Sequence, residues 1–285
     1  MCQSAAIPSE WSSAMAGSCG ILIIVLWIER LTEPEEAFLE MRMPELTPLA
    51  TEEAFRFTCH SRVPCFNHCC RDLNQALTPY DVLCLKRYLN LSTREFFESY
   101  AVVHAGSATG LPVASFRFSH DDARLCPFVT SEGCRVYSAR PSSCRIYPLA
   151  RALQRNRQDG RTQVHYALLR EAHCRGFDES GVQTVRQWLA DQQLTNYLAM
   201  NDALMELIAL KNQIRPGPLE PEHRQMVQEA FYDPELIQDK ARQGALPQME
   251  QTGLEPLPEK GDLEHGLKWS LQWIGYVLFG RRLTL

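Results

Sequence analysis

The spacing of the cysteines is the feature that most restricts what this chain can fold into. Eleven cysteines occur in 285 residues, and all but Cys2, Cys19 and Cys84 fall into two groups. The first group is Cys59-x5-Cys65-x3-Cys69-Cys70, and the second is Cys126-x7-Cys134-x9-Cys144 followed by Cys174. Thiolate ligands gathered in this way favour zinc, copper(I) or an iron–sulfur cluster. The grouped cysteines therefore predict a metal site.

The adjacent pair Cys69-Cys70 allows two arrangements. In an extended backbone neighbouring side chains point to opposite sides, so the two sulfurs would serve two metals, or one metal and one supporting contact. In a bent backbone both sulfurs could reach one polynuclear cluster. A disulfide between adjacent residues would need a strained small ring, which disfavours that alternative.

Several observations leave the metal open between zinc and iron. Some grouped cysteines could be buried thiols instead, a common environment for cysteine, but so many on turn-rich segments favour metal binding. Zinc sites usually use Cys-x2–4-Cys pairs, a spacing that occurs here at Cys65 and Cys69 but not in the second group. A Cys-Pro step such as Cys126-Pro127 also occurs in ferredoxins, which hold a 4Fe–4S cluster. Three histidines beside cysteines could substitute as ligands, although a place near the metal or at the surface is favoured for each: His60, His68 and His173.

Arginine follows four of the cysteines, and a fifth arginine lies in the loop before Cys144. Eight thiolates carry about eight negative charges, of which two Zn²⁺ ions would offset about four. Guanidinium groups stay charged and offer several donors, so we expect them to bind the cofactor site by hydrogen bonds to sulfur. The alternative is that they are solvated or pair with surface carboxylates. These arginines are Arg71, Arg135, Arg140, Arg145 and Arg175.

Composition and charge exclude several classes of function. The net charge of −5 and the absence of a basic stripe argue against nucleic-acid binding. An apolar content of 45% is enough for a hydrophobic core, and cysteine is too sparse for a disulfide scaffold. Free thiols predict a reducing compartment, and hence the cytoplasm. Neither a G-x-S-x-G elbow nor a P-loop is present, and no substrate or reaction follows from the sequence.

The first 50 residues are expected to form an irregular extension. The apolar run GILIIVLWI at 20–28 is shorter than the about 20 residues needed to span a bilayer, and no Lys or Arg precedes it as in a signal peptide. It predicts a buried strand, a loose extension, or a stretch upstream of the native start. The last reading would place that start at Met41 or Met43.

The hydrophobic pattern predicts an α+β chain. Residues 51–180 are expected to form a small cysteine-rich metal-binding domain with short antiparallel strands and helices, and 181–285 a helical C-terminal region. Capping-box patterns begin helices at Thr78 and Ser92, and Thr184 is expected to be the N-cap of another helix. Strands are expected at VASFRF, on both sides of a Ser-Glu-Gly turn, and at TQVHYALL, whereas RPSSCRIYPLAR is expected to be mostly loop. A last amphipathic helix should bury Trp269 and Trp273.

The order of these motifs resembles the YkgJ-type cysteine cluster family, which is described as a zinc- or iron-chelating domain. The likeness covers about residues 55–178 and rests on C…C…CC, LTPYD, CPFV and GCRVYSARPSSCRIYPL. A looser resemblance links the pattern to flagellin lysine methylases, whose cysteines are thought to hold an iron–sulfur cluster. The family resemblance implies that the chelating set is Cys59, Cys65, Cys69, Cys70, Cys126, Cys134, Cys144 and Cys174.

Three functions fit this resemblance. The first is a metal-binding protein that holds zinc or iron, or a 4Fe–4S cluster, and has a redox or auxiliary role. The second is a structural metal module whose helical C-terminal half binds a protein partner. The third is an iron–sulfur enzyme that modifies proteins, such as a lysine N-methylase.

Overall fold

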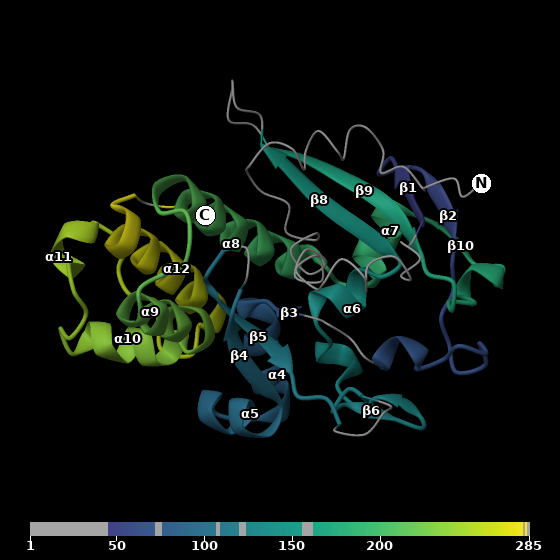
Figure 1. Cartoon of the computed structure of the whole chain (residues 1–285), viewed down its shortest axis with the longest axis horizontal. Coiled ribbons are helices and arrows are strands. Elements are labelled where there is room, and N and C mark those ends of the chain that lie inside the picture. The colour runs from purple at the N-terminus through teal and green to yellow at the C-terminus, as the bar shows by residue number, and fades with distance from the viewer. Residues whose placement is uncertain are drawn as a thin grey trace. The chain divides into compact units, whose positions relative to one another are not determined.

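The structure is a computed structural model that describes residues 45–71, 76–106, 109–119, 124–155, 162–281 and 283. It confirms the α+β class, with short antiparallel sheets and a helical C-terminal region (Figure 1). The expectations for GILIIVLWI and for a start at Met41 or Met43 lie outside the described residues.

The chain divides into two compact units, each made of separate stretches of sequence. The first unit comprises the described residues of Met1–Gln75, Phe118–Tyr137 and Ser142–Thr195, and the second those of Ala76–Arg117, Ser138–Pro141 and Asn196–Leu285. All eight grouped cysteines belong to the first unit, whereas Cys84 belongs to the second. The division into domains at residues 50 and 180 stays a prediction.

A three-stranded antiparallel sheet is the largest regular part of the first unit, with β8 and β9 as its long hairpin (Figure 1). Its strands, in spatial order, are β1 (Glu45–Leu49), β9 (Thr162–Arg170) and β8 (Leu149–Arg155). The strand predicted at TQVHYALL is confirmed as β9. The sequence predicted no regular element before residue 50, but β1 pairs with β9 there. Pro48 is tolerated in β1 because this strand lies at the sheet edge.

The remaining elements of the first unit are short. The two strands predicted around the Ser-Glu-Gly turn are confirmed as an antiparallel pair. The prediction that RPSSCRIYPLAR is mostly loop is wrong, because a short helix and then β8 form there; Pro141 stands just before this helix, where proline is compatible with a helix start. The short elements are β2 (Ala54–Arg56), β10 (Val182–Thr184), β6 (Val129–Thr130), β7 (Gly133–Cys134), α6 (Ser142–Ile146), α7 (Val185–Asp191), and the 3₁₀ turns η2 (His68–Cys70) and η4 (Gly176–Asp178).

An aromatic cluster forms part of the core of the first unit. Phe57 lies 3% exposed at its centre. Its ring contacts those of Tyr147, Phe177 and Trp188 at centroid distances of 5.8, 5.2 and 5.5 Å. The indole N–H of Trp188 donates to the carbonyl of Ile146 at 3.1 Å. This packing fixes the residues that follow α6.

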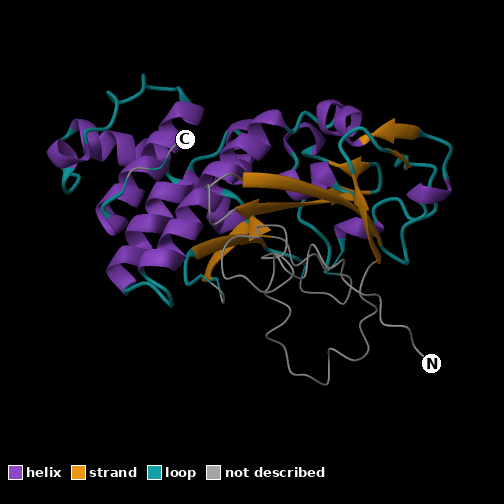
Figure 2. Ribbon diagram, turned by 90° about the horizontal axis from the view of Figure 1, so that it is seen from above, coloured by secondary structure: helices purple, strands orange, loops and turns teal. Residues whose placement is uncertain are grey.

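The second unit is largely helical, as the colours of Figure 2 show. The capping boxes predicted at Thr78 and Ser92 are confirmed, with Asp81 and Glu95 as their partners. Its helices are α4 (Pro79–Leu89), α5 (Thr93–Ser99), α8 (Thr195–Ile214), α9 (Pro221–Tyr232), α10 (Pro234–Arg242), α11 (Met249–Thr252) and α12 (Leu263–Phe279). Its sheet has the order β3 (Ala76–Leu77), β5 (Pro112–Phe116) and β4 (Ala101–Ala105); the turn η3 (Tyr137–Ala139) spans the unit boundary.

Helix α12 supplies much of the core of the second unit. Trp269 and Trp273, one helical turn apart, are 3% and 1% exposed, which confirms the predicted core packing. Along the part of the chain that the structure describes, no helix combines the length and apolar character needed to cross a membrane.

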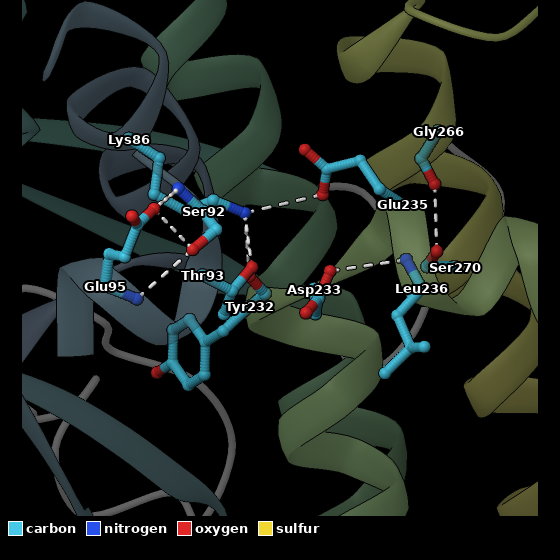
Figure 3. Close-up of polar contacts among 10 residues, drawn as sticks. All are labelled: Lys86, Ser92, Thr93, Glu95, Tyr232, Asp233, Glu235, Leu236, Gly266 and Ser270. Carbon is cyan, nitrogen blue, oxygen red and sulfur yellow. Dashed lines mark hydrogen bonds and ion pairs between the residues drawn. The ribbon is translucent and has the colours of Figure 1, made fainter. Parts of the chain in front are cut away.

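A buried lysine joins several elements of the second unit. The side chain of Lys86 on α4 is 5% exposed. Its ammonium donates to the Thr93 hydroxyl at 2.5 Å, to the Tyr232 carbonyl at 3.5 Å and to the Glu235 carboxylate at 3.4 Å (Figure 3). The charge thus holds the start of α5 and the end of α9 on α4. A buried ammonium needs such partners, because moving its charge out of water without hydrogen-bond acceptors costs free energy.

Replacing this ammonium should destabilise the chain. In Lys86→Met the side chain keeps its approximate volume, but the partly buried hydroxyl of Thr93 and the buried carbonyl of Tyr232 lose a charged donor. We expect the free energy of unfolding, measured by chemical denaturation, to fall by about 1–3 kcal/mol. The control is Lys260→Met at an exposed position, which should change it by less than about 0.5 kcal/mol. Equal stability of the two variants would contradict the structural role of Lys86.

Candidate metal centre

Backbone hydrogen bonds bring the cysteine-bearing segments of the first unit together. The amide of Cys126 donates to the carbonyl of Cys70 at 2.9 Å, and Arg71 forms a β-bridge with Leu125 beside it. Next to Cys59, the amide of Thr58 donates to the carbonyl of Gly176 at 3.0 Å. The segment that holds the first group is therefore bound to both parts of the second.

Cys65 and Cys174 form one contact between the groups. The backbone N–H of Arg175 donates to the sulfur of Cys65 at 3.1 Å. Cys174 is held in a turn, since its own amide donates to the carbonyl of Glu171 at 3.0 Å. Burial raises the pKa of the Cys174 thiol, whose neighbours are the Tyr147 hydroxyl and the Cys65 thiol.

The other contact joins the adjacent pair to the second group. The backbone is bent at η2, and the thiol of Cys69 faces that of Cys70, although Cys69 as a residue is exposed. This thiol–thiol contact, together with burial, raises the pKa of Cys69 far above its ordinary value. Burial raises the pKa of Cys126 to about 11, with the thiols of Cys134 and Cys69 as further causes. The extended alternative for the pair is thus not the conformation observed.

Two more grouped cysteines are exposed, whereas the ungrouped cysteine that the structure describes is half-buried. Cys59 follows β2 and Cys144 lies on α6, and both are exposed. Cys84 is half-buried on α4, where burial raises its pKa and its neighbours include Tyr197 and Tyr80. No disulfide joins any of the described cysteines.

The donor set fits a soft metal ion, but the described side chains do not form a complete coordination sphere. In the residues that the structure covers, no group of three or more Cys, His, Asp or Glu is arranged to hold a metal ion. Burial opposes ionisation of Cys126 and Cys174. A bound cation would reverse this effect, because a coordinating thiol loses its proton. The assignment of the eight cysteines as ligands stays a prediction.

The arginines that follow cysteines have varied surroundings. The guanidinium of Arg135 lies 5.7 Å from the centroid of the Phe128 ring, and that of Arg145, which is 4% exposed, donates to the carbonyl of Gln192 at 3.0 Å. Arg175 reaches Cys65 by its backbone N–H, and Arg71 is exposed. Arg140 is buried in a segment of the second unit. Their predicted binding of the cofactor site stays a prediction.

Carboxylates lie beside two of the three histidines that flank cysteines. His60 pairs with Glu179 at 3.4 Å, and His173 pairs with Glu171 at 3.8 Å. His68 lies in η2 directly before the adjacent cysteines.

Tyr147 and Glu171 are neighbours of the cysteines that the sequence analysis did not single out. The carboxylate of Glu171 contributes to the raised pKa of both the Cys69 thiol and the Tyr147 hydroxyl. The hydroxyl of Tyr147 lowers the pKa of the Cys174 thiol and so opposes part of the rise that burial causes. The signal in the sequence was their closeness to Cys144 and Cys174, but only the pairing of β8 with β9 brings these two segments together.

Comparison with known families agrees with the cysteine pattern. Residues 58–180 match the model of the CxxCxxCC family, described as "Putative zinc- or iron-chelating domain", which is the YkgJ-type family. The match includes all eight grouped cysteines. No curated protein and no solved structure matches the chain.

Thiol labelling can test which cysteines share the site. In metal-free protein at pH about 8, iodoacetamide should modify exposed Cys59 and Cys144 at least roughly tenfold faster than Cys126, which is buried and has little thiolate. Added Zn²⁺ should protect all eight grouped cysteines, whereas Cys84 should react at an unchanged rate. Mass spectrometry of the labelled peptides gives each rate. The ligand assignment would be contradicted if zinc protected Cys84, or if zinc did not slow the labelling of the grouped cysteines.

Proposed function

We propose, from the match of residues 58–180 to the model of the zinc- or iron-chelating YkgJ-type family, that the eight grouped cysteines are metal ligands and that they hold an iron–sulfur cluster. The metal set is Cys59, Cys65, Cys69, Cys70, Cys126, Cys134, Cys144 and Cys174.

The observation that carries the ligand assignment is the contact between the two groups. Cys65 and the amide of Arg175 lie 110 residues apart in sequence, yet meet at 3.1 Å. Cys70 and Cys126 are joined through their backbones at 2.9 Å. Long-range contacts of this kind cost chain entropy, so their concentration at the cysteines supports a common centre.

The bend at Cys69-Cys70 favours a cluster over two separate zinc ions. With the two thiols facing each other, both can serve one polynuclear centre. A cluster bound by thiolates carries electrons, and its potential is set by hydrogen bonds to sulfur. We therefore assign the domain a redox or auxiliary role in the reducing cytoplasm, where thiols persist. A structural zinc module that binds a protein partner is the alternative; a protein-modifying activity such as lysine N-methylation would be an added function of the cluster form.

Anaerobic purification followed by elemental analysis tests the metal. We expect iron with acid-labile sulfide and a brown protein with broad visible absorption, since the sulfide distinguishes a cluster from a mononuclear iron site. Colourless protein that contains zinc and no sulfide would leave the chelating domain in place but contradict the cluster. Protein that takes up neither metal would contradict both.

A double substitution tests the ligands. Cys69→Ser with Cys70→Ser should remove most of the bound metal and lower the thermal midpoint, because metal ligation contributes directly to folding in domains with few long regular elements. Cys84→Ser, a thiol outside the two groups, is the matched control and should keep its metal. Metal content is measured after gel filtration. Full metal content and an unchanged midpoint in the double variant would show that the pair does not ligate.

A further inference from the structure

The backbone directs Tyr147 toward the turn that carries Cys174. Leu149 pairs with Leu168 in the β8–β9 ladder, and the amide of Leu169 donates to the carbonyl of Pro148 at 2.8 Å. Continued by two residues, this register sets Tyr147 opposite Arg170, the last residue of β9. The turn from Glu171 to Cys174 begins at the next residue.

The ring of Tyr147 is fixed by its packing. It meets the ring of Phe57 edge-on at 5.8 Å and 76°, and Phe57 is itself buried between Phe177 and Trp188. The phenol therefore cannot turn out to solvent without breaking the aromatic cluster.

The hydroxyl of Tyr147 is buried and makes no hydrogen bond of acceptable geometry. Burial raises its pKa, and the Cys174 thiol and the Glu171 carboxylate are the neighbours that contribute to the shift. The contact with Cys174 is thus close, but it is not a formed hydrogen bond. A buried hydroxyl without a partner is costly, so its position beside a cysteine needs an explanation.

We propose that Tyr147 is a positioning residue of the metal centre, whose hydroxyl donates to the sulfur of Cys174 when that sulfur is a metal-bound thiolate. A neutral thiol is a weak acceptor, whereas a charged acceptor forms a shorter and stronger hydrogen bond. Such bonds orient a ligand and tune the metal. This inference rests on the proposed role of Cys174 as a ligand.

The phenol complements the other donor at this contact. The sulfur of Cys65 accepts the N–H of Arg175, whereas the hydroxyl of Tyr147 and the backbone N–H of Gly176 are the donors beside Cys174. Glu171 is the competing acceptor, but its carboxylate also pairs with His173 at 3.8 Å.

The test compares Tyr147→Phe with Tyr137→Phe in the full chain, loaded with Zn²⁺. Tyr137 is 59% exposed and belongs to the same unit. Competition with a chromophoric chelator should show roughly tenfold or greater weakening of zinc affinity in Tyr147→Phe and none in Tyr137→Phe. Glu171→Gln in the wild-type background should keep zinc affinity within a factor of about two to three, a limit we set well below the effect expected for Tyr147.

Stability without metal separates this role from ordinary packing. Metal-free Tyr147→Phe should be as stable as the metal-free wild type or more stable, since it loses a buried hydroxyl without a partner. Its zinc-loaded form should be less stable than zinc-loaded wild type. A metal-free variant that is destabilised or unfolded would overturn the proposal, because the hydroxyl would then have a structural partner.

The remaining outcomes are also decisive. Equal zinc affinity of Tyr147→Phe and wild type would refute the role of Tyr147 while leaving the chelating cysteines intact. A larger loss of zinc affinity in Glu171→Gln than in Tyr147→Phe would assign the contact to the carboxylate instead. A wild-type chain that binds neither zinc nor iron would refute the proposed function itself.

Discussion

The hydrogen bond from the amide of Cys126 to the carbonyl of Cys70 is the interaction on which the cysteine cluster depends. It holds the bend of the adjacent pair against the hairpin of β6 and β7, where Cys134 lies. The result is a set of partly buried thiols, and their burial opposes ionisation. A cation is the natural counterpart of such a set, because it lowers the cost of the thiolate charges. The pairing of β8 with β9 places the buried hydroxyl of Tyr147 beside the Cys174 thiol.

Local signals in the sequence were sufficient for some elements and not for others. The capping boxes of Thr78, Ser92 and Thr184 lie within four residues of chain, so the helix starts followed directly. Strand β1 was missed because its existence depends on pairing with β9, more than a hundred residues away, and because Pro48 reads as a break. The short helix α6 was missed because two prolines flank it. Non-local pairing leaves no local signature, and five-residue helices leave only a weak one.

The candidate site shows the same division. The eight cysteines could be selected from their grouping along the chain, and the motifs around them predicted the family model that matches residues 58–180. The contacts between particular cysteines could not be predicted from the sequence. The bend at Cys69-Cys70 and the contact between Cys65 and the Cys174 turn are products of the tertiary fold. Arginine after cysteine suggested guanidinium groups at sulfur, which stays a prediction; the contacts observed are from Arg145 to the carbonyl of Gln192 and from the amide of Arg175 to Cys65.

We propose that sulfur from these cysteines surrounds a metal bound by this chain. X-ray absorption at the edge of the bound metal measures this directly, since it reports the type and distance of the nearest atoms. The account predicts a first shell dominated by sulfur at about 2.3 Å, the length of a metal–thiolate bond, and for a cluster a second shell of iron. A first shell of nitrogen and oxygen at about 2.0–2.2 Å, without sulfur, would contradict it.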